Sequence, residues 1–327
     1  MSNNIKPLVS VIVLTYNNFK RISETIISVL RQDYPNIELI IAEDCSKTFP
    51  TELVNNVVNE NRKSNLVNFC IINNENNVGT VKNLNNSIKS CQGEIIFCFG
   101  SDDMFVDKNT ISSVVDIFLQ NNCDAVYTSR ILYSDDKIRT VLPHVADWAK
   151  IKKLNTKMSL YSSFITTHHY SFFIGVTTTY KKTAIVDHNY FDEHYRLLED
   201  LPMTEKMLWN NNVVLCPELP TILYECKYGV SAKGQTNPIL KADLNYYNLH
   251  GKLAHYNELD NKTKRHIDFG IRRTNNKNNL GLIPAFFKYF PQLIRWICYC
   301  FSRGLAGYKD SKVIRNITLD DYKSFLS

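Results

Sequence analysis

The stretch that decides the fold is Gly93–Asp107, GEIIFCFGSDDMFVD. Its apolar run Ile95–Phe99 has the length and composition of a buried strand. The run ends in Gly-Ser-Asp-Asp, which places two adjacent carboxylates where a buried strand emerges at the edge of a sheet. Neighbouring acids repel each other, and a divalent cation with oxygen ligands commonly keeps both ionised. The pattern predicts a cation site at Asp102 and Asp103; a polar turn after a strand is the alternative.

Three apolar runs upstream of this stretch also have the composition of buried parallel strands. They are Leu8–Leu14, Ile37–Ala42 and Leu66–Ile72. Apolar residues recur at helical spacing between them and again after residue 107, so strands and helices alternate to about residue 125. This alternation predicts an α/β fold with a doubly wound, mostly parallel sheet. Ligands of such sheets bind beyond the carboxyl ends of the strands, where Thr15–Asn17, Asp44 and the Asp102–Asp103 pair fall.

The second half of the chain has a different pattern. Shorter apolar segments at 125–129, 130–133, 137–142, 172–180, 213–216 and 221–226 predict strands. Glu199 and Asp200 open a predicted helix, a place where the helix dipole favours acids without any catalytic role. From residue 262 to residue 315 basic residues greatly outnumber acidic ones, so the C-terminal end is a basic extension.

Composition limits where the protein works. Its 327 residues carry a formal net charge of +6, and 44% hydrophobic residues suffice for a real core. Nine cysteines, with no Cys-x-x-Cys pair, favour a reducing cytosol and argue against zinc. The N-terminus, MSNNIKPLVS, has no pattern of a secretory signal. The segment 280–303 joins aromatic and basic residues with prolines, which predicts a helix on a membrane surface, with a packed core helix as the alternative.

The order of these features resembles the family 2 glycosyltransferases of the GT-A fold, of the bacterial surface-polysaccharide type. The resemblance covers about residues 7–230 and implies a nucleotide site at the carboxyl ends of the strands. The nucleotide contacts that it implies are Thr15, Tyr16, Asn17, Asp44, Gly79, Lys82, Asn85, Ser101 and Asp102. For Lys82 and Asn85, a place on a solvated helix face is an equal alternative.

The resemblance also implies a metal. Gly100-Ser101-Asp102-Asp103 stands where the family has an Asp-x-Asp motif, so Asp102 and Asp103 would hold Mg²⁺ or Mn²⁺ with diphosphate oxygens. Gly100 replaces the first acid of that motif, and weaker metal affinity is expected. Cys45 and Leu84 replace a usual glycine and a common arginine of the family.

A Glu-Asp pair in the second half matches the family's catalytic base. The resemblance implies Asp200 as the base that takes the proton of an acceptor hydroxyl, and Glu199 as its orienting or acceptor-binding neighbour. Attack from the face opposite the leaving group implies inversion at the anomeric carbon.

The sequence is therefore interpreted as a metal-dependent inverting hexosyl- or N-acetylhexosaminyltransferase with a UDP-linked donor and a lipid-linked or growing glycan acceptor. We expect a nucleotide-sugar-binding half at 1–125, an acceptor-binding half at 126–230 and a helical, membrane-associating extension at 231–327. The expected location is cytoplasmic, peripheral on the inner face of the plasma membrane, without a nucleic-acid partner.

Two other functions stay open at this point. A sugar nucleotidyltransferase would need a glycine-rich basic loop after the first strand, which Thr15–Phe19 does not supply. A non-catalytic nucleotide- or glycan-binding protein of the same fold remains an alternative, because Gly100 replaces an acid.

Overall fold

The structure is a computed structural model. It describes residues 6–134, 137–154, 156–166, 173–226 and 237–275, and the single positions 290, 294, 325 and 326. The predicted membrane-surface segment 280–303 lies outside these ranges, apart from the exposed Phe290 and Ile294. Within the described ranges, no helix has both the length and the apolar character needed to cross a membrane.

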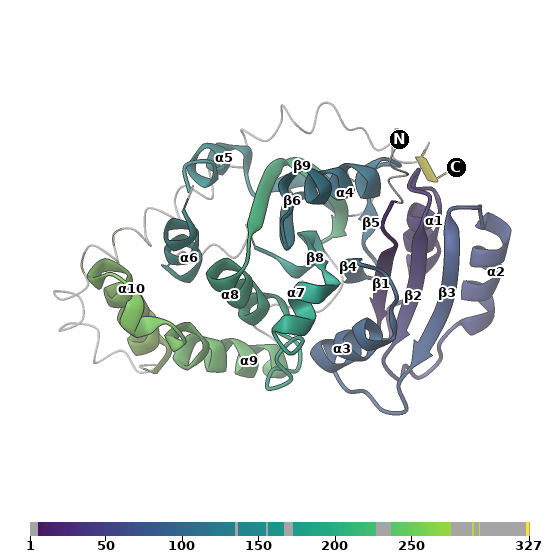
Figure 1. Cartoon of the computed structure of the whole chain (residues 1–327). Helices are drawn as coiled ribbons and strands as arrows, with labels where there is room; N and C mark the ends of the chain where they lie inside the picture. Colours follow the sequence, from purple (N-terminus) through teal and green to yellow (C-terminus); the bar gives the residue numbers. More distant parts are fainter. Residues whose placement is uncertain are drawn as a thin grey trace.

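Four parallel strands form the first half of the sheet, in the order β3-β2-β1-β4. They are β1 (Val9–Thr15), β2 (Ile37–Glu43), β3 (Leu66–Asn73) and β4 (Ile95–Gly100). Each ends one residue later than the sequence pattern predicts. Because the strands are parallel, the polar turns that follow β1, β2 and β4 meet at one edge of the sheet (Figure 1).

Helices cover both faces of this half, which explains why its strands are apolar without alternation. On one face, α1 (Ile22–Leu30), α2 (Thr51–Asn61) and α4 (Thr110–Asn121) share a core with Val9, Val11 and Val13. On the other face, α3 (Thr80–Ser90) packs through Val81, Leu84 and Ile88 against Ile12 and Ile40. The doubly wound arrangement predicted from the sequence is confirmed.

The second half continues the sheet with mixed strand directions. Its strands are β5 (Met104–Phe105), β6 (Ala125–Ser134), β7 (Lys137–Leu142), β8 (Thr178–Lys181) and β9 (Val213–Glu225). The full order is β3-β2-β1-β4-β8-β6-β9-β5, with β7 on β6. β6 and β9 are each one strand where the sequence pattern predicts two, and the predicted strand at 172–180 is reduced to β8.

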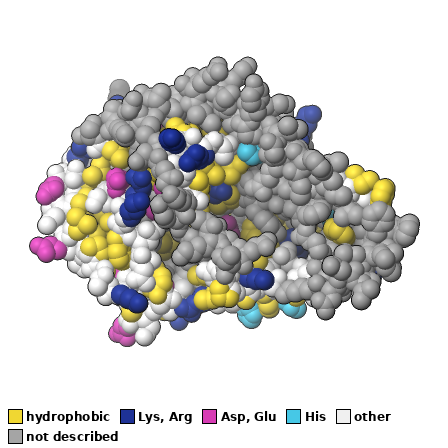
Figure 2. Space-filling view, turned by 180° about the vertical axis from the view of Figure 1, so that it is seen from behind, with side chains coloured by type: hydrophobic (Ala, Val, Ile, Leu, Met, Phe, Trp, Pro, Cys, Tyr) yellow, Lys and Arg dark blue, Asp and Glu magenta, His cyan; other side chains and the backbone are white. Residues whose placement is uncertain are grey.

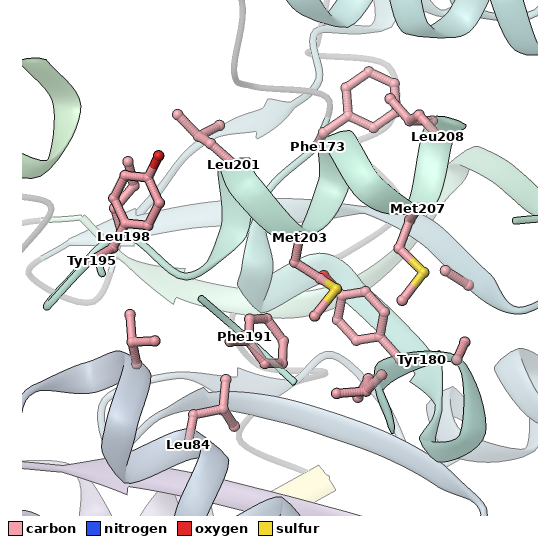
Figure 3. Close-up of a cluster of buried hydrophobic side chains, with 14 of the residues drawn as sticks. Leu84, Phe173, Tyr180, Phe191, Tyr195, Leu198, Leu201, Met203, Met207 and Leu208 are labelled. Carbon is pink, nitrogen blue, oxygen red and sulfur yellow. The ribbon is translucent and has the colours of Figure 1, made fainter. Parts of the chain in front are cut away.

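The remaining helices pack beside this half of the sheet (Figure 1). They are α5 (Val145–Ile151), α6 (Lys157–Thr166), α7 (Lys182–Asp187), α8 (Asp200–Asn210), α9 (Pro238–Leu249) and α10 (Asn261–Asn275). Figure 3 shows Met203 and Met207 of α8 packed toward Tyr180 and Phe191. Tyr247 and Ile267, from α9 and α10, belong to the same core, so the described part of the C-terminal extension packs on the second half.

Candidate active site

The turn after β4 is held by hydrogen bonds from α1 and from the turn after β1. Thr25 Oγ1 on α1 donates to the carbonyl oxygens of Ser101, at 2.9 Å, and of Asp103, at 2.8 Å. Ser101 Oγ donates to the carbonyl oxygen of Asn18, and Asn18 Nδ2 donates to Asp102 Oδ2 at 2.9 Å. Thr25 on α1 therefore holds the backbone of the turn that follows β4, and Asn18 in the turn after β1 holds the side chains of Ser101 and Asp102.

Asp103 is the buried carboxylate of this turn. The side chain is 4% exposed, and its Oδ2 accepts from Gly100 N at 3.2 Å. Its Oδ1 is buried without a hydrogen-bond partner among the residues that the structure describes. Burial, and then the charge of Asp102, raise the pKa of Asp103 well above its ordinary value. A buried carboxylate with an unused oxygen fits a cation ligand, because a cation would satisfy the oxygen and favour the ionised form.

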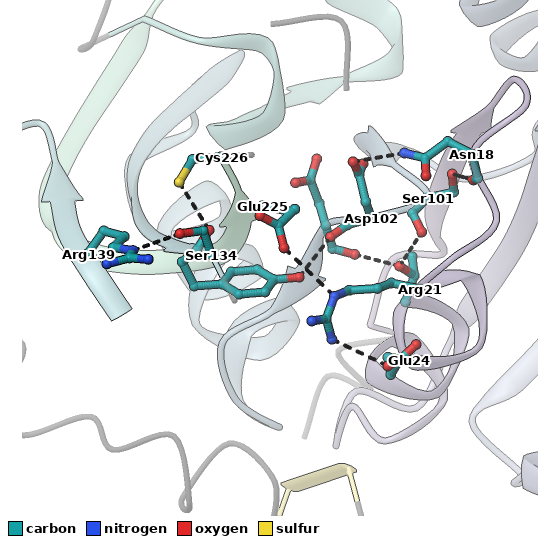
Figure 4. A network of polar contacts seen from close by, with 12 residues as sticks. Asn18, Arg21, Glu24, Ser101, Asp102, Ser134, Arg139, Glu225 and Cys226 are labelled. Atoms are coloured by element: carbon teal, nitrogen blue, oxygen red, sulfur yellow. Dashed lines mark hydrogen bonds and ion pairs between the residues drawn. The ribbon is translucent and has the colours of Figure 1, made fainter. Parts of the chain in front are cut away.

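Glu225, at the end of β9, is a third acid beside this turn (Figure 4). Its negative charge, together with the larger effect of burial, raises the pKa of Asp102. Arg21 Nε lies 3.8 Å from Glu225 Oε2, and the Arg21 guanidinium lies over the ring of Tyr133, 5.3 Å from its centre. Tyr133 in turn donates to the carbonyl oxygen of Asp102. Across the described part of the chain, no group of three or more His, Cys, Asp or Glu side chains could hold a metal by itself.

The turn after β1 presents an exposed ring. Tyr16 is 50% exposed, whereas Thr15 is buried and donates to the carbonyl oxygen of Asn18. Asn17 adopts a left-handed conformation, with φ of 51°, and its backbone N–H donates to Ser46 Oγ at 2.8 Å. The turns after β1 and β2 thus hold each other and leave the Tyr16 ring open to solvent.

Asp44, predicted to accept a hydrogen bond from a nucleotide base, already accepts hydrogen bonds from the protein at both carboxylate oxygens. It is buried, and its Oδ1 accepts from Val78 N at 2.8 Å and Asn74 Nδ2 at 3.1 Å. Its Oδ2 accepts from Gly79 N and Asn77 Nδ2, both at 2.9 Å. In this conformation the carboxylate organises the loop before α3, and a base could bond to it only by replacing one of these donors.

The predicted contacts on α3 are divided between solvent and core. Lys82 is exposed at the start of the helix. Asn85 is 1% exposed, and its amide exchanges hydrogen bonds with the backbone of Phe191, at 2.9 and 3.0 Å. Asn85 therefore ties the loop that follows α7 to α3. Gly79, with φ of 90°, is the residue before α3.

Glu199 and Asp200 lie half-buried at the start of α8. Asp200 Oδ1 accepts from Leu201 N at 2.8 Å, and a Cβ on Gly175 would lie 3.0 Å from Glu199 Oε1. Burial, and then the charge of Asp200, raise the pKa of Glu199 to about 8. Burial also raises the pKa of Asp200, but the N–H groups of Leu201 and Gly175 and the charge of Arg130 oppose that rise. Burial thus raises the pKa of both carboxyls, and hydrogen bonds and the charge of Arg130 oppose the rise at Asp200.

Two residues link this pair electrostatically to the turn after β4. Cys98 on β4 has its thiol pKa raised by burial and then by the charges of Glu199 and Asp103. Arg130 on β6 acts electrostatically on both Asp103 and Asp200, and its guanidinium lies over the ring of Tyr224, 4.6 Å from its centre. Seen from behind, the molecule is hollowed near its centre (Figure 2).

The sequence reasoning missed Glu225, Arg130 and Cys98. Cys98 lies four residues before Asp102 on a strand that the sequence identified, so its place on the cleft side of β4 could have been considered. Glu225 and Arg130 carry no local signal, because only the pairing of β6 with β9 brings them to the site.

Comparisons with known proteins identify the family and the fold. The poly(ribitol-phosphate) beta-N-acetylglucosaminyltransferase TarS of Staphylococcus aureus strain MW2 is 26% identical over 206 residues, 62% of this chain and 33% of TarS. The Escherichia coli protein WfgD, a UDP-Glc:alpha-D-GlcNAc-diphosphoundecaprenol beta-1,3-glucosyltransferase, is 27% identical over 153 residues, 45% of this chain and 55% of WfgD. The chain thus spans about a third to a half of the length of these curated relatives.

A solved structure and a family model complete the comparison. The crystal structure of S. aureus TarS 1-349 in complex with UDP-GlcNAc matches with a TM-score of 0.55 at 19% identity, covering 88% of this chain and 79% of that one. This likeness shows that the two share the GT-A fold expected from the sequence. The model of the family described as Glycosyl transferase family 2 matches residues 10–185, more than half of the chain. The chain therefore belongs to glycosyl transferase family 2.

Proposed function

We propose that the protein is an inverting glycosyltransferase that moves one hexosyl or N-acetylhexosaminyl residue from a UDP-linked donor to a hydroxyl of a lipid-linked or growing glycan. The observation that carries the proposal is that Glu199 and Asp103 both raise the pKa of Cys98, while the charge of Arg130 lowers the pKa of both Asp103 and Asp200. TarS crystallised with UDP-GlcNAc supports the donor class, and the printed name of WfgD supports a lipid-linked acceptor.

On the donor side, the Tyr16 ring would stack on the nucleotide base, beside Thr15 and Asn17, and its exposure supports this role. Asp44 would contact the base by exchanging a donor of the loop at 74–79. The exposed Lys82 at the start of α3 is a candidate for phosphate contact. Asn85 drops out of this set, because its amide is bonded to Phe191.

Asp102 and Asp103 would hold Mg²⁺ or Mn²⁺ together with diphosphate oxygens, near the backbone of Ser101. Support comes from the unsatisfied Oδ1 of Asp103 and from the half-buried position of Asp102. When bound, such a cation offsets the negative charge that grows on the leaving diphosphate.

The chain's own residues would move the proton. Asp200, favoured in its ionised form by Arg130 and by two backbone N–H groups, would accept the proton of the acceptor hydroxyl as that hydroxyl attacks the anomeric carbon. Glu199, with a pKa of about 8, would keep its proton and donate a hydrogen bond to the acceptor. The base and the diphosphate would then flank the sugar from opposite sides, which implies inversion.

In this proposal residues 1–125 bind the nucleotide sugar, residues 126–230 bind the acceptor, and residues 231–327 form the extension. The basic and aromatic composition of 280–303 supports peripheral contact with the inner face of the plasma membrane.

The test measures UDP release and glycan transfer over a panel of UDP-sugars, with and without EDTA. We expect transfer that requires Mg²⁺ or Mn²⁺. Asp200→Asn should lower kcat by at least about 100-fold and leave UDP affinity within a few-fold, because general-base catalysis typically contributes this much or more. Asp192→Asn, an exposed acid in the preceding loop, is the matched control and should retain wild-type kcat.

Near wild-type turnover by Asp200→Asn would refute the assignment of the base. If UDP bound but neither hydrolysis nor transfer occurred with any donor and metal, the protein would be a binding module rather than an enzyme.

A further inference from the structure

We propose that Asp243 and Arg196 are positioning residues that fix the Glu199–Asp200 pair relative to the donor half; the inference rests on the function proposed above. Asp243 belongs to α9, outside the matched family region of residues 10–185. The geometry that supports it is a continuous path of hydrogen bonds from α9 to the turn after β2.

The first part of the path joins α9 to the loop before α8. Asp243 is buried, and its Oδ2 accepts from the backbone N–H groups of Arg196, at 3.0 Å, and Leu197, at 2.7 Å. Hydrogen bonds to an ionised acceptor are stronger than neutral ones. One carboxylate thus fixes two consecutive peptide groups two to four residues before the catalytic pair.

The second part joins the same loop to the donor half. Arg196 Nη2 donates to the carbonyl oxygen of Asn77 at 2.8 Å and to Asn77 Oδ1. The carbonyl oxygen of Arg196 accepts from Val81 N at 3.2 Å. Asn77 also donates to Asp44, so the path reaches the base-binding turn. Arg196 therefore lies between the two halves of the site and is bonded to both.

The packing leaves this loop little freedom. A Cβ on Gly79 would lie 2.5 Å from Arg196 Cγ and 2.7 Å from its carbonyl oxygen. Tyr195 and Leu198, on either side of Arg196 and Leu197, are buried in the hydrophobic core that α8 also joins (Figure 3). Figure 1 places the loop between α3 and α9. A displacement of Arg196 and Leu197 would consequently be carried into Glu199 and Asp200.

The alternative is that Asp243 only stabilises the fold. A purely structural role would lower the stability without a specific effect on kcat, whereas a positioning role lowers kcat while UDP binding persists. The chain offers a matched control on the same helix. Asn237 caps α9 by accepting from the backbone N–H groups of Ile239 and Leu240, so its removal also deletes two side-chain to backbone hydrogen bonds.

The experiment compares Asp243→Ala, Asp243→Asn and Asn237→Ala in the full-length protein. Asp243→Ala should lower kcat by about 100-fold, since small misplacements of reacting groups cost this much, and should leave UDP affinity within a few-fold. Asp243→Asn keeps an acceptor oxygen and should recover most of that loss. Asn237→Ala should keep wild-type kcat, although its melting temperature falls.

Hydrogen exchange of the peptide 191–203 gives a readout that does not depend on activity. Exchange should accelerate in Asp243→Ala and stay at the wild-type rate in Asn237→Ala. If Asp243→Ala folds poorly, Arg196→Ala removes an exposed side chain and should reproduce the loss of kcat.

If the wild-type enzyme is active, an unchanged kcat or an unchanged exchange rate in Asp243→Ala would overturn the inference. An equal loss of kcat in Asn237→Ala would overturn it as well. An inactive wild type would instead refute the proposed function, and the exchange data would still decide whether Asp243 fixes the loop.

Discussion

The buried carboxyl of Glu205 on α8 predicts how stability depends on pH. The side chain is 5% exposed and accepts a 2.7 Å hydrogen bond from the hydroxyl of Tyr161 on α6. Burial raises its pKa from the usual value of 4.5 to about 7 in the folded protein, against smaller opposing effects of Tyr161 and other neighbours. The folded state therefore binds this proton more tightly than the unfolded state does.

The sign follows from that difference. Below pH 4.5 both states carry the proton and the group has no effect on the free energy of unfolding. Between pH 4.5 and about 7 the unfolded state loses this proton while the folded state keeps it, so the free energy of unfolding falls as pH rises, and the integrated cost by pH 8 is about 3 kcal/mol. Glu205→Gln removes this titration and keeps an acceptor for Tyr161. The variant should therefore gain about 2 to 3 kcal/mol relative to wild type between pH 5 and pH 8.

Urea unfolding at pH 5, 6, 7 and 8, under reducing conditions and followed by tryptophan fluorescence, measures this difference. Glu60→Gln, an exposed carboxyl at the end of α2, serves as the control and should follow the wild-type pH dependence. Parallel curves for wild type and Glu205→Gln would refute the argument that Glu205 is protonated in the folded protein.

Three further predictions concern the site and its surroundings. Asp103→Ala should weaken the binding of UDP in the presence of Mg²⁺ by about 10-fold or more, because a charge-assisted contact of this kind contributes about 1.5 to 3 kcal/mol. UDP without metal should bind as before, and calorimetry can measure both affinities. Gly79→Ala should lower the free energy of unfolding by about 1 to 3 kcal/mol and reduce turnover, because the residue has φ of 90° and its Cβ would meet Arg196. Thermal unfolding measures the loss of stability. Gly270→Ala is the control, because a Cβ there meets nothing within 4 Å. Deleting 280–327 should shift the protein from membranes to the soluble fraction after cell lysis, and an unchanged distribution would contradict the membrane-surface hypothesis.

The parallel half of the fold could be predicted because burial on both faces leaves one local signature. Before their last residues, β1, β2 and β4 are apolar except for Ser10 and Glu38, and their polar turns follow directly. The meeting of Asp44 with the Asp102–Asp103 turn at one edge needed only the parallel direction of these strands. Predicting this arrangement required no knowledge of contacts between residues that are far apart in the sequence.

The second half of the sheet, with its mixed strand directions, depends on contacts that the sequence does not reveal locally. β9 appears broken by Pro217 and Pro220, but it continues as one strand because its pairing with β6 shifts register between Tyr127 and Arg130. The predicted strand at 172–180 fails at Gly175, whose backbone lies against Glu199 in a short 3₁₀ turn. Side chains that act through such pairings could not be found in advance.

In the proposed donor site, the hydrogen bonds that Asp44 already accepts make the two ends of a nucleotide contribute unequally to its affinity. A base that bonds to Asp44 exchanges one hydrogen bond for another, and an exchange of this kind contributes little net free energy. The aromatic face of Tyr16 adds attraction that hardly distinguishes one ring from another. Affinity must then reside mainly in the charged end of the ligand, so a free nucleoside would be held far less tightly than the same nucleoside carrying two phosphates.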